Sequence, residues 1–196
     1  MTNTPYPPSI LYPIDEASYF HFHPAVSYLF SLVTTVDLED IKKCKVYKRS
    51  YLQYLPWYST VKGGGAITLG NGRWSRIYFT ENFFSADQDY YKGNGYLDKP
   101  NPWLRLASHE VTHIGHGKRF GSIIIYLIIF IYQYVIYGHD KAPLEIEADA
   151  GTTRYHRFNQ YVVNRYKTSL ADIIASDSSD DDKCRLIEKY WLSLNE

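Results

Sequence analysis

The sequence predicts a single α+β domain, in which a small β-sheet or hairpin precedes two helices that carry His, Glu and Asp side chains. Three observations lead to this prediction. Two β-prone segments, 66–69 and 76–80, flank the turn residues Gly70-Asn71-Gly72. Apolar residues then recur at helical spacing over 102–115. A further helix with proline at its start begins near residue 142.

The length and composition exclude several classes of protein. The chain has 196 residues, 45% hydrophobic and 21% charged, which suits one domain with a core and excludes disorder throughout. Its 21 basic and 21 acidic residues cancel, which argues against a nucleic-acid partner. The N-terminus has neither a basic region nor an apolar run, so no secretory signal is predicted. We therefore expect a cytoplasmic protein, or an effector domain exported by a non-classical route.

The region before the hairpin, residues 1–60, is expected to form an N-terminal arm or lobe. Residues 1–24 are rich in proline, which predicts an extended arm lying on the body. Helical stretches are expected over 25–36 and 37–43. A basic cluster follows, made of Lys42, Lys43, Lys45, Lys48 and Arg49. The cluster is either a solvated face or a docking patch. The lobe either binds substrate or lies across the cleft as an inhibitory arm.

The central region, residues 61–175, is expected to hold the catalytic core. Its first helix starts at Asn101-Pro102, an N-cap followed by a first helical residue, and is expected to end at Gly115 and Gly117. The next stretch, Ile123 to Tyr137, is almost wholly apolar over about 15 residues, whereas a membrane-spanning helix needs about 20. We therefore expect a buried helix there, followed by a helix from Ala142-Pro143 to about Tyr166.

The C-terminal region, residues 176–196, is expected to combine an acidic loop and a helix. The loop covers 176–182, and its spacing does not match a calcium-binding loop. Apolar residues in helical register over 183–194 predict a helix that docks on the body. Cys44 and Cys184 can form one long-range disulfide or remain two thiols, and the sequence leaves both alternatives open.

The residues that carry chemistry lie in the helix predicted over 102–115. They read His109-Glu110-Val111-Thr112-His113, an H-E-x-x-H pattern. Residues i and i+4 lie about 40° apart on one helix face, so the two imidazoles can occupy two corners of a tetrahedral zinc site. Glu110 can then act as general base on a water that the metal activates. Two histidines on the surface of an ordinary helix are the structural alternative.

A catalytic zinc site needs a third protein ligand, which the next helix can supply. Glu145 lies near the start of that helix, and Asp149 follows one turn later on the same face. Glu145 can be the third ligand, and Asp149 can accept the free N–H of a zinc-bound histidine. An acidic first turn favoured by the helix dipole would also explain the two acids.

This pattern resembles the gluzincin metallopeptidases, a group that includes thermolysin and the prenyl-protein and heat-shock membrane proteases. The resemblance rests on H-E-x-x-H followed by a later helix with E-x-x-A-D, and it covers residues 101–158. It implies a zincin-like fold with Zn²⁺ held by His109, His113 and Glu145. It also implies that Glu110 is the catalytic base and that Asp149 contacts a ligand histidine from outside.

A second resemblance concerns the longer segment from Tyr78 to Glu147. This segment is similar to zinc-peptidase domains at the C-termini of bacterial Rhs-type polymorphic toxins. The similarity rests on Asn82-Phe83-Phe84-Ser85-Ala86-Asp87, the H-E-x-x-H helix and Gly138-His139-Asp140. It implies a secreted antibacterial effector or toxin, with an inhibitor or immunity protein as a partner.

Other positions complete the predicted site. In metzincins the motif continues as H-E-x-x-H-x-x-G-x-x-H, but here the last two positions hold His116 and Arg119, so the chain departs from that group. His116 can replace a ligand, contact a ligand from outside, or line the cleft. His156 lies eleven residues after Glu145, about 20° around on the same helix face, so it or its neighbour Tyr155 can donate a hydrogen bond to the oxyanion, although a histidine on the helix surface fits equally well. The segment 76–80 is the expected edge strand for an extended substrate.

The predicted function is therefore a zinc-dependent peptidase acting on a protein or peptide substrate. A zinc amidase acting on cell-wall or other small amides is one alternative. A non-catalytic, zinc-stabilised binding module is another, and it predicts a closed site made of His109, His113, His116 and Glu145. A single membrane crossing between His113 and Glu145 would keep them from sharing one ion, so a membrane partner is not expected, and association with a membrane by partial insertion is the remaining alternative.

Overall fold

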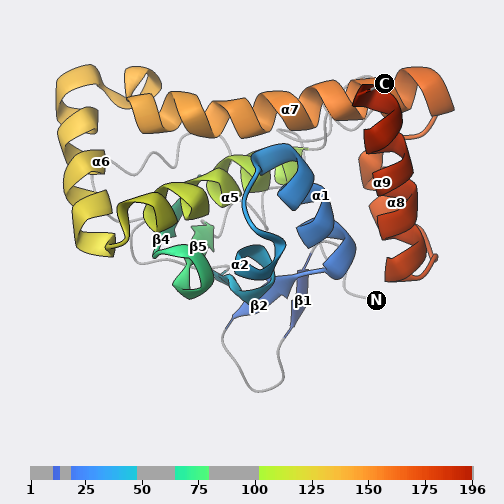
Figure 1. Ribbon diagram of the computed structural model, residues 1–196, viewed down its shortest axis with the longest axis horizontal. Helices are drawn as coiled ribbons and strands as arrows, with labels where there is room; N and C mark the ends of the chain where they lie inside the picture. The colour runs from blue at the N-terminus through green and yellow to red at the C-terminus, as the bar shows by residue number, and fades with distance from the viewer. Residues whose placement is uncertain (1–10, 14–18, 48–64, 80–101, 196) are drawn as a thin grey trace.

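The computed structural model describes residues 11–13, 19–47, 65–79 and 102–195. A small mixed sheet precedes most of the helices, so the predicted α+β fold is confirmed (Figure 1). Residues 1–10 of the expected arm lie outside the described residues, as do Lys48 and Arg49 of the basic cluster.

The described strands form one sheet with the order β1-β2-β3-β5-β4. The strands are β1 (Leu11–Pro13), β2 (Phe20–Phe22), β3 (Lys45–Tyr47), β4 (Ala66–Leu69) and β5 (Arg76–Phe79). Neighbouring strands are antiparallel except for β3 and β5, which are parallel. Part of the expected N-terminal arm is therefore a component of the sheet, because β2 pairs with both β1 and β3.

The predicted hairpin is confirmed, but its place in the sheet differs from the expectation. β4 pairs with β5 so that Ala66 faces Phe79 and Leu69 faces Arg76. β3 pairs with the other side of β5 and makes β5 an inner strand. The expectation that 76–80 is the edge strand is therefore wrong for Arg76–Phe79, and β4 is an outer strand of the described sheet.

The helices account for most of the remaining described residues. They are α1 (Pro24–Thr34), α2 (Leu38–Lys43), α5 (Pro102–Phe120), α6 (Ile123–Tyr137), α7 (Pro143–Tyr166), α8 (Leu170–Ala175) and α9 (Asp180–Asn195). α9 begins inside the expected acidic loop, because the Ser179 hydroxyl accepts the backbone N–H of Asp182 at 3.2 Å and caps the helix.

Helix α5 runs past the two glycines that were expected to end it. A Cβ atom at Gly117 would collide with the carbonyl oxygen of Gly70, in the turn after β4. Gly117 therefore allows close packing of helix against turn, which is a tertiary requirement rather than a helix stop. The helix ends instead at Gly121, whose φ of 68° favours glycine.

One hydrophobic cluster joins the sheet to the helices. Its members include Phe22 and Val46 on strands, Leu29, Phe30, Ala107, Val111 and Ile114 on α1 and α5, and Phe158 and Ile187 on α7 and α9. The apolar face predicted for the helix over 102–115 is therefore buried as expected. Figure 1 shows α5 lying beneath the long helix α7, with α6 at one end of the pair and α8 and α9 at the other.

Helix α6 is exposed, so the expectation of a buried helix over 123–137 is wrong. Tyr126 is its only buried side chain, whereas Ile124, Ile128 and Val135 are 66%, 62% and 74% exposed. Among the described elements it packs against α5, α7 and the 3-10 turn η3, with Phe130 against His113 and Gln133 bonded to Leu144. Among the described residues no single helix is long and apolar enough to cross a membrane, although α5 and α6 meet that criterion as a pair bent by 117°.

The two cysteines are free thiols in this structure. Cys44 is buried between α2 and β3, and Cys184 is partly buried on α9. Burial raises the pKa of the Cys44 thiol well above its ordinary value, which makes this thiol chemically inert. Of the two alternatives that the sequence left open, the structure therefore shows the unpaired one.

Candidate metal centre

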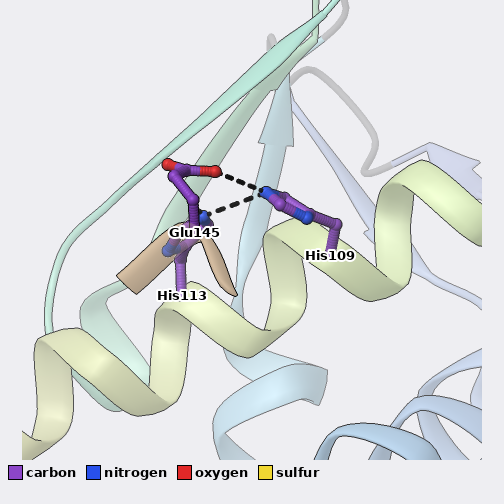
Figure 2. A group of neighbouring side chains, drawn as sticks. All are labelled: His109, His113 and Glu145. Carbon is purple, nitrogen blue, oxygen red and sulfur yellow. Dashed lines mark hydrogen bonds and ion pairs between the residues drawn. The ribbon is translucent and has the colours of Figure 1, made fainter. Parts of the chain in front are cut away.

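Helices α5 and α7 bring His109, His113 and Glu145 together, with their nitrogen and oxygen atoms facing a common point (Figure 2). The Nε2 atom of His109 lies 3.0 Å from Glu145 Oε2 and 3.3 Å from His113 Nε2. The remaining pair, His113 Nε2 and Glu145 Oε1, is 3.7 Å apart. Two imidazole nitrogens and one carboxylate oxygen are a ligand set that suits Zn²⁺. The group is a candidate three-ligand metal site.

The close crossing of α5 and α7 depends on Gly151. A Cβ atom there would collide with the Thr112 hydroxyl and would lie 3.2 Å from the carbonyl oxygen of Ser108. Only glycine lets the two helix backbones approach this closely. Glu145 lies on the same helix, less than two turns earlier, and is thereby held against His109.

Helix α6 also helps to position Glu145. The side-chain oxygen of Gln133 on α6 accepts the backbone N–H of Leu144 at 3.0 Å, which satisfies a donor in the first turn of α7. On the same side of α6, the ring of Phe130 packs edge-on against His113, with 6.4 Å between ring centroids. The inner side of α6 is thus a wall of the candidate site.

The ligand histidines are held from outside the cluster. Asp149 Oδ1 lies 3.1 Å from His109 Nδ1, so this carboxylate accepts the ring N–H and leaves Nε2 facing the cluster. The Nδ1 atom of His113 lies 3.1 Å from Nδ1 of His116, and one of the two rings donates a hydrogen bond to the other. His116 in turn reaches Glu147 at 3.1 Å through Nε2. His116 therefore supports His113 from behind and does not join the three converging donors.

Glu110 is buried beside the cluster and is held by strand β4. The Thr68 hydroxyl lies 2.7 Å from Glu110 Oε2 and 2.9 Å from the Glu110 carbonyl oxygen. Burial raises the pKa of Glu110 to about 6, although the charge of His109 and the Thr68 hydrogen bond oppose the rise. A carboxyl group with such a pKa can take up and release a proton near neutral pH.

The electrostatic environment of the cluster favours a cation. Burial lowers the pKa of His109, but the Glu145 hydrogen bond and the charges of Glu110, Glu145 and Asp149 outweigh it and raise the pKa to about 9. Burial and the neighbouring His109 lower the pKa of His113. The acids around His109 therefore stabilise positive charge at this point, as a metal site requires.

The sequence analysis assigned no role at the site to two residues, His139, which it named only within the toxin resemblance, and Thr68. His139, in the 3-10 turn η3 (His139–Lys141), lies with Nε2 3.7 Å from Glu145 Oε2 and is 61% exposed. Its position just before the Ala142-Pro143 helix start is a signal that could have identified it. Thr68 had no such signal, because its contact with Glu110 spans 42 residues of sequence.

Tyr155 and His156 are not brought to the cluster. Tyr155 is fully buried in the hydrophobic cluster, and His156 is exposed on α7. The prediction considered only the angle around the helix. Ten or eleven residues also advance about 15–16 Å along it, which carries both side chains away from Glu145.

The chain matches no protein-family model, no curated protein and no solved structure. The gluzincin resemblance therefore rests on the motif residues, together with the His109, His113 and Glu145 cluster on helices that follow a small mixed sheet.

Proposed function

We propose that this chain is a zinc-dependent metallopeptidase of the gluzincin type. One observation carries the proposal, namely the convergence of His109, His113 and Glu145 from two helices within 4.8 Å of one another. The buried carboxyl of Glu110 follows directly after the first of these residues and has a pKa raised to about 6. Three metal ligands with a general base beside them are the least that zinc-dependent hydrolysis of an amide bond requires.

The residues of the chain divide the work between them. Zinc held by His109, His113 and Glu145 supplies Lewis-acid polarisation of the scissile carbonyl and a lowered pKa for water. Glu110 takes the proton from the attacking water and delivers it to the leaving amine. Thr68 donates a hydrogen bond to Oε2 of Glu110 at 2.7 Å and so orients the carboxylate for this transfer.

The proposed substrate is a protein or peptide in extended form. Within the described part of the sheet, β4 has no partner on its outer side, and this strand carries Thr68. A peptide that pairs with the outer edge of β4 would lie close to Glu110. His139 is exposed beside Glu145, so we assign to it the oxyanion-binding role first expected of His156 and Tyr155.

The alternatives differ in what they require. A cell-wall or small-amide amidase would use the same residues and differ only in its substrate. A non-catalytic zinc module needs a fourth protein ligand, and His116, the expected one, contacts the outer side of His113 instead. This placement favours the catalytic proposal. The role as an antibacterial effector with an immunity partner, and an export route for it, rest on the toxin resemblance alone.

Metal analysis of three variants tests the proposal. We expect about one zinc ion per chain in the wild type and in Glu110→Gln, and a strong loss in Glu145→Ala. With unfolded protein as substrate, Glu110→Gln should lower the hydrolysis rate by about 10²–10⁴. Glu188→Ala, which removes a glutamate on the distant helix α9, is the matched control and should change neither readout. Full zinc binding by Glu145→Ala, or full hydrolysis by Glu110→Gln, would contradict the proposal.

A further inference from the structure

Exposed apolar side chains are concentrated on helix α6. Twelve large hydrophobic side chains are exposed in the part of the chain that the structure describes, and nine of them belong to α6. The nine are Ile123, Ile124, Ile125, Ile128, Ile131, Tyr132, Val135, Ile136 and Tyr137. The helix carries no charged residue over its 15 positions. Apolar clustering of this kind marks a surface that binds something.

The outer side of α6 is distinct from the side that builds the site. Tyr126, Phe130 and Gln133 point inward, and Phe130 and Gln133 contact His113 and Leu144. Seven of the nine exposed residues, all except Ile123 and Tyr137 at the two ends of the helix, lie on the opposite side of α6. The helix itself lies at the end of the molecule opposite α9 (Figure 1). Contacts with the metal centre therefore explain the inner side of α6 and leave its apolar outer side unexplained.

The shape of the outer side narrows the choice of partner. Successive residues of a helix are about 100° apart around its axis. The exposed residues Ile131, Tyr132, Val135 and Ile136 therefore cover about 140° of the helix circumference. Ile124, Ile125 and Ile128 fall within the same arc. The result is a convex apolar ridge. A flat protein surface or a second copy of the ridge would cover one flank only, whereas lipid chains close around a convex ridge on all sides.

A basic hollow adjoins the start of the ridge. Its lining includes Lys43, Lys45 and Arg76 together with Trp74 and Ile123, and it contains no acidic residue. Ile123, the first residue of α6, lines the hollow, and the ridge begins with the next residue, Ile124. Trp74 is 72% exposed. Basic side chains and an exposed tryptophan beside an apolar ridge are complementary to the headgroup layer of an anionic membrane.

We propose that the outer side of α6 and the adjoining basic hollow form a docking surface for an anionic lipid bilayer. The helix lies in the interface with its ridge among the acyl chains, because 15 residues extend only about 22 Å and fall short of the bilayer core. Lys43, Lys45 and Arg76 contact the phosphates of anionic lipids. This docking is a partial insertion and not a crossing, so it leaves His113 and Glu145 on the same side of the membrane, and it replaces the expectation that no membrane takes part. It does not depend on the proposed peptidase activity.

Co-sedimentation of the full chain with vesicles tests the proposal. Vesicles of phosphatidylcholine alone are compared with vesicles that also contain phosphatidylglycerol. We expect preferential binding to the anionic vesicles, weakened by salt. Ile124→Ser combined with Ile128→Ser should lower the partition coefficient by about tenfold or more. Lys43→Gln and Lys45→Gln should each lower binding to anionic vesicles by about fivefold.

Matched variants separate docking from folding. Leu192→Ser and Lys189→Gln change exposed residues of the same kinds on α9 and should leave vesicle binding unchanged. Zinc content, measured on every variant, reports whether the inner side of α6 still packs against the metal centre. Absence of binding to anionic vesicles would overturn the proposal, as would binding that the isoleucine variants do not weaken. A dimer in solution that the isoleucine variants dissociate would overturn it in favour of a second copy of the chain.

Discussion

Helices α5 and α6 follow one another in the chain. In most helices the apolar side chains are buried and the polar ones exposed, and these two helices depart from that rule in opposite ways. α5 buries many polar side chains, whereas the almost wholly apolar α6 exposes most of its surface. The buried polar residues of α5 are Ser108, Glu110, Thr112, His113 and His116. Burial of unpaired polar groups is costly, and exposure of a large apolar ridge forgoes the stability that burial would add.

The contrast shows that both helices serve something other than stability. Each buried polar side chain of α5 has a partner; for example, Glu110 binds Thr68 and His113 contacts His116. Such pairing reduces the cost of burial without removing it. The two departures therefore identify the two surfaces that we connect with function, a metal centre on α5 and a docking ridge on α6.

Zinc should produce the largest difference between the two helices. At a zinc concentration about a thousandfold above the dissociation constant, the free energy of unfolding should rise by about 4 kcal/mol in the wild type. His113→Ala on α5 should abolish most of this gain, because it removes a ligand. Ile128→Ala on α6 should retain it. Thermal unfolding with and without zinc measures both, and an undiminished gain in His113→Ala would show that zinc binds elsewhere.

The same substitution in each helix should show the next largest difference. Ile114 on α5 is fully buried, so Ile114→Ala should lower the free energy of unfolding by about 3 kcal/mol through a cavity in the core. Ile128→Ala removes an exposed side chain, and we expect a change within about 0.5 kcal/mol. Urea unfolding measures the two values, and equal losses would refute the exposed position of α6.

Glycines near the junction of α5 and α6 should show the smallest difference. Gly117→Ala forces a methyl group against the Gly70 carbonyl and should cost about 2 kcal/mol. At Gly121 nothing lies within 4 Å of an added Cβ, and only the φ of 68° opposes alanine, at about 1 kcal/mol. Thermal unfolding of both variants tests this order. A harmless Gly117→Ala would mean that α5 does not pack closely on the β4 turn.

Local patterns predicted much of the fold and the centre of the site. The hairpin of β4 and β5 was predictable because two β-prone runs flank a glycine-rich turn. The starts of α5 and α7 were predictable because proline marks the first helical turn. His109 and His113 were recognisable because their spacing places both on one face of a helix. These signals all depend on neighbours within a few residues.

Long-range contacts explain what the sequence analysis missed or misjudged. The parallel pairing of β3 with β5 makes β4 the outer strand, and nothing near Arg76–Phe79 signals it. The angular argument for His156 omitted the rise of the helix. The burial of α6 was inferred from its composition, but α5 and α7 cover only its inner side.

The sequence by itself determined which side chains are available for chemistry and how they are spaced within each helix, because helix geometry repeats every few residues. The tertiary structure decided which of them meet. Gly151 and Gly117 bring α7 and the β4 turn close to α5, so that Glu145 reaches His109 and Thr68 reaches Glu110. The tertiary structure also leaves the ridge of α6 uncovered, since burial depends on how elements pack and composition alone does not specify it.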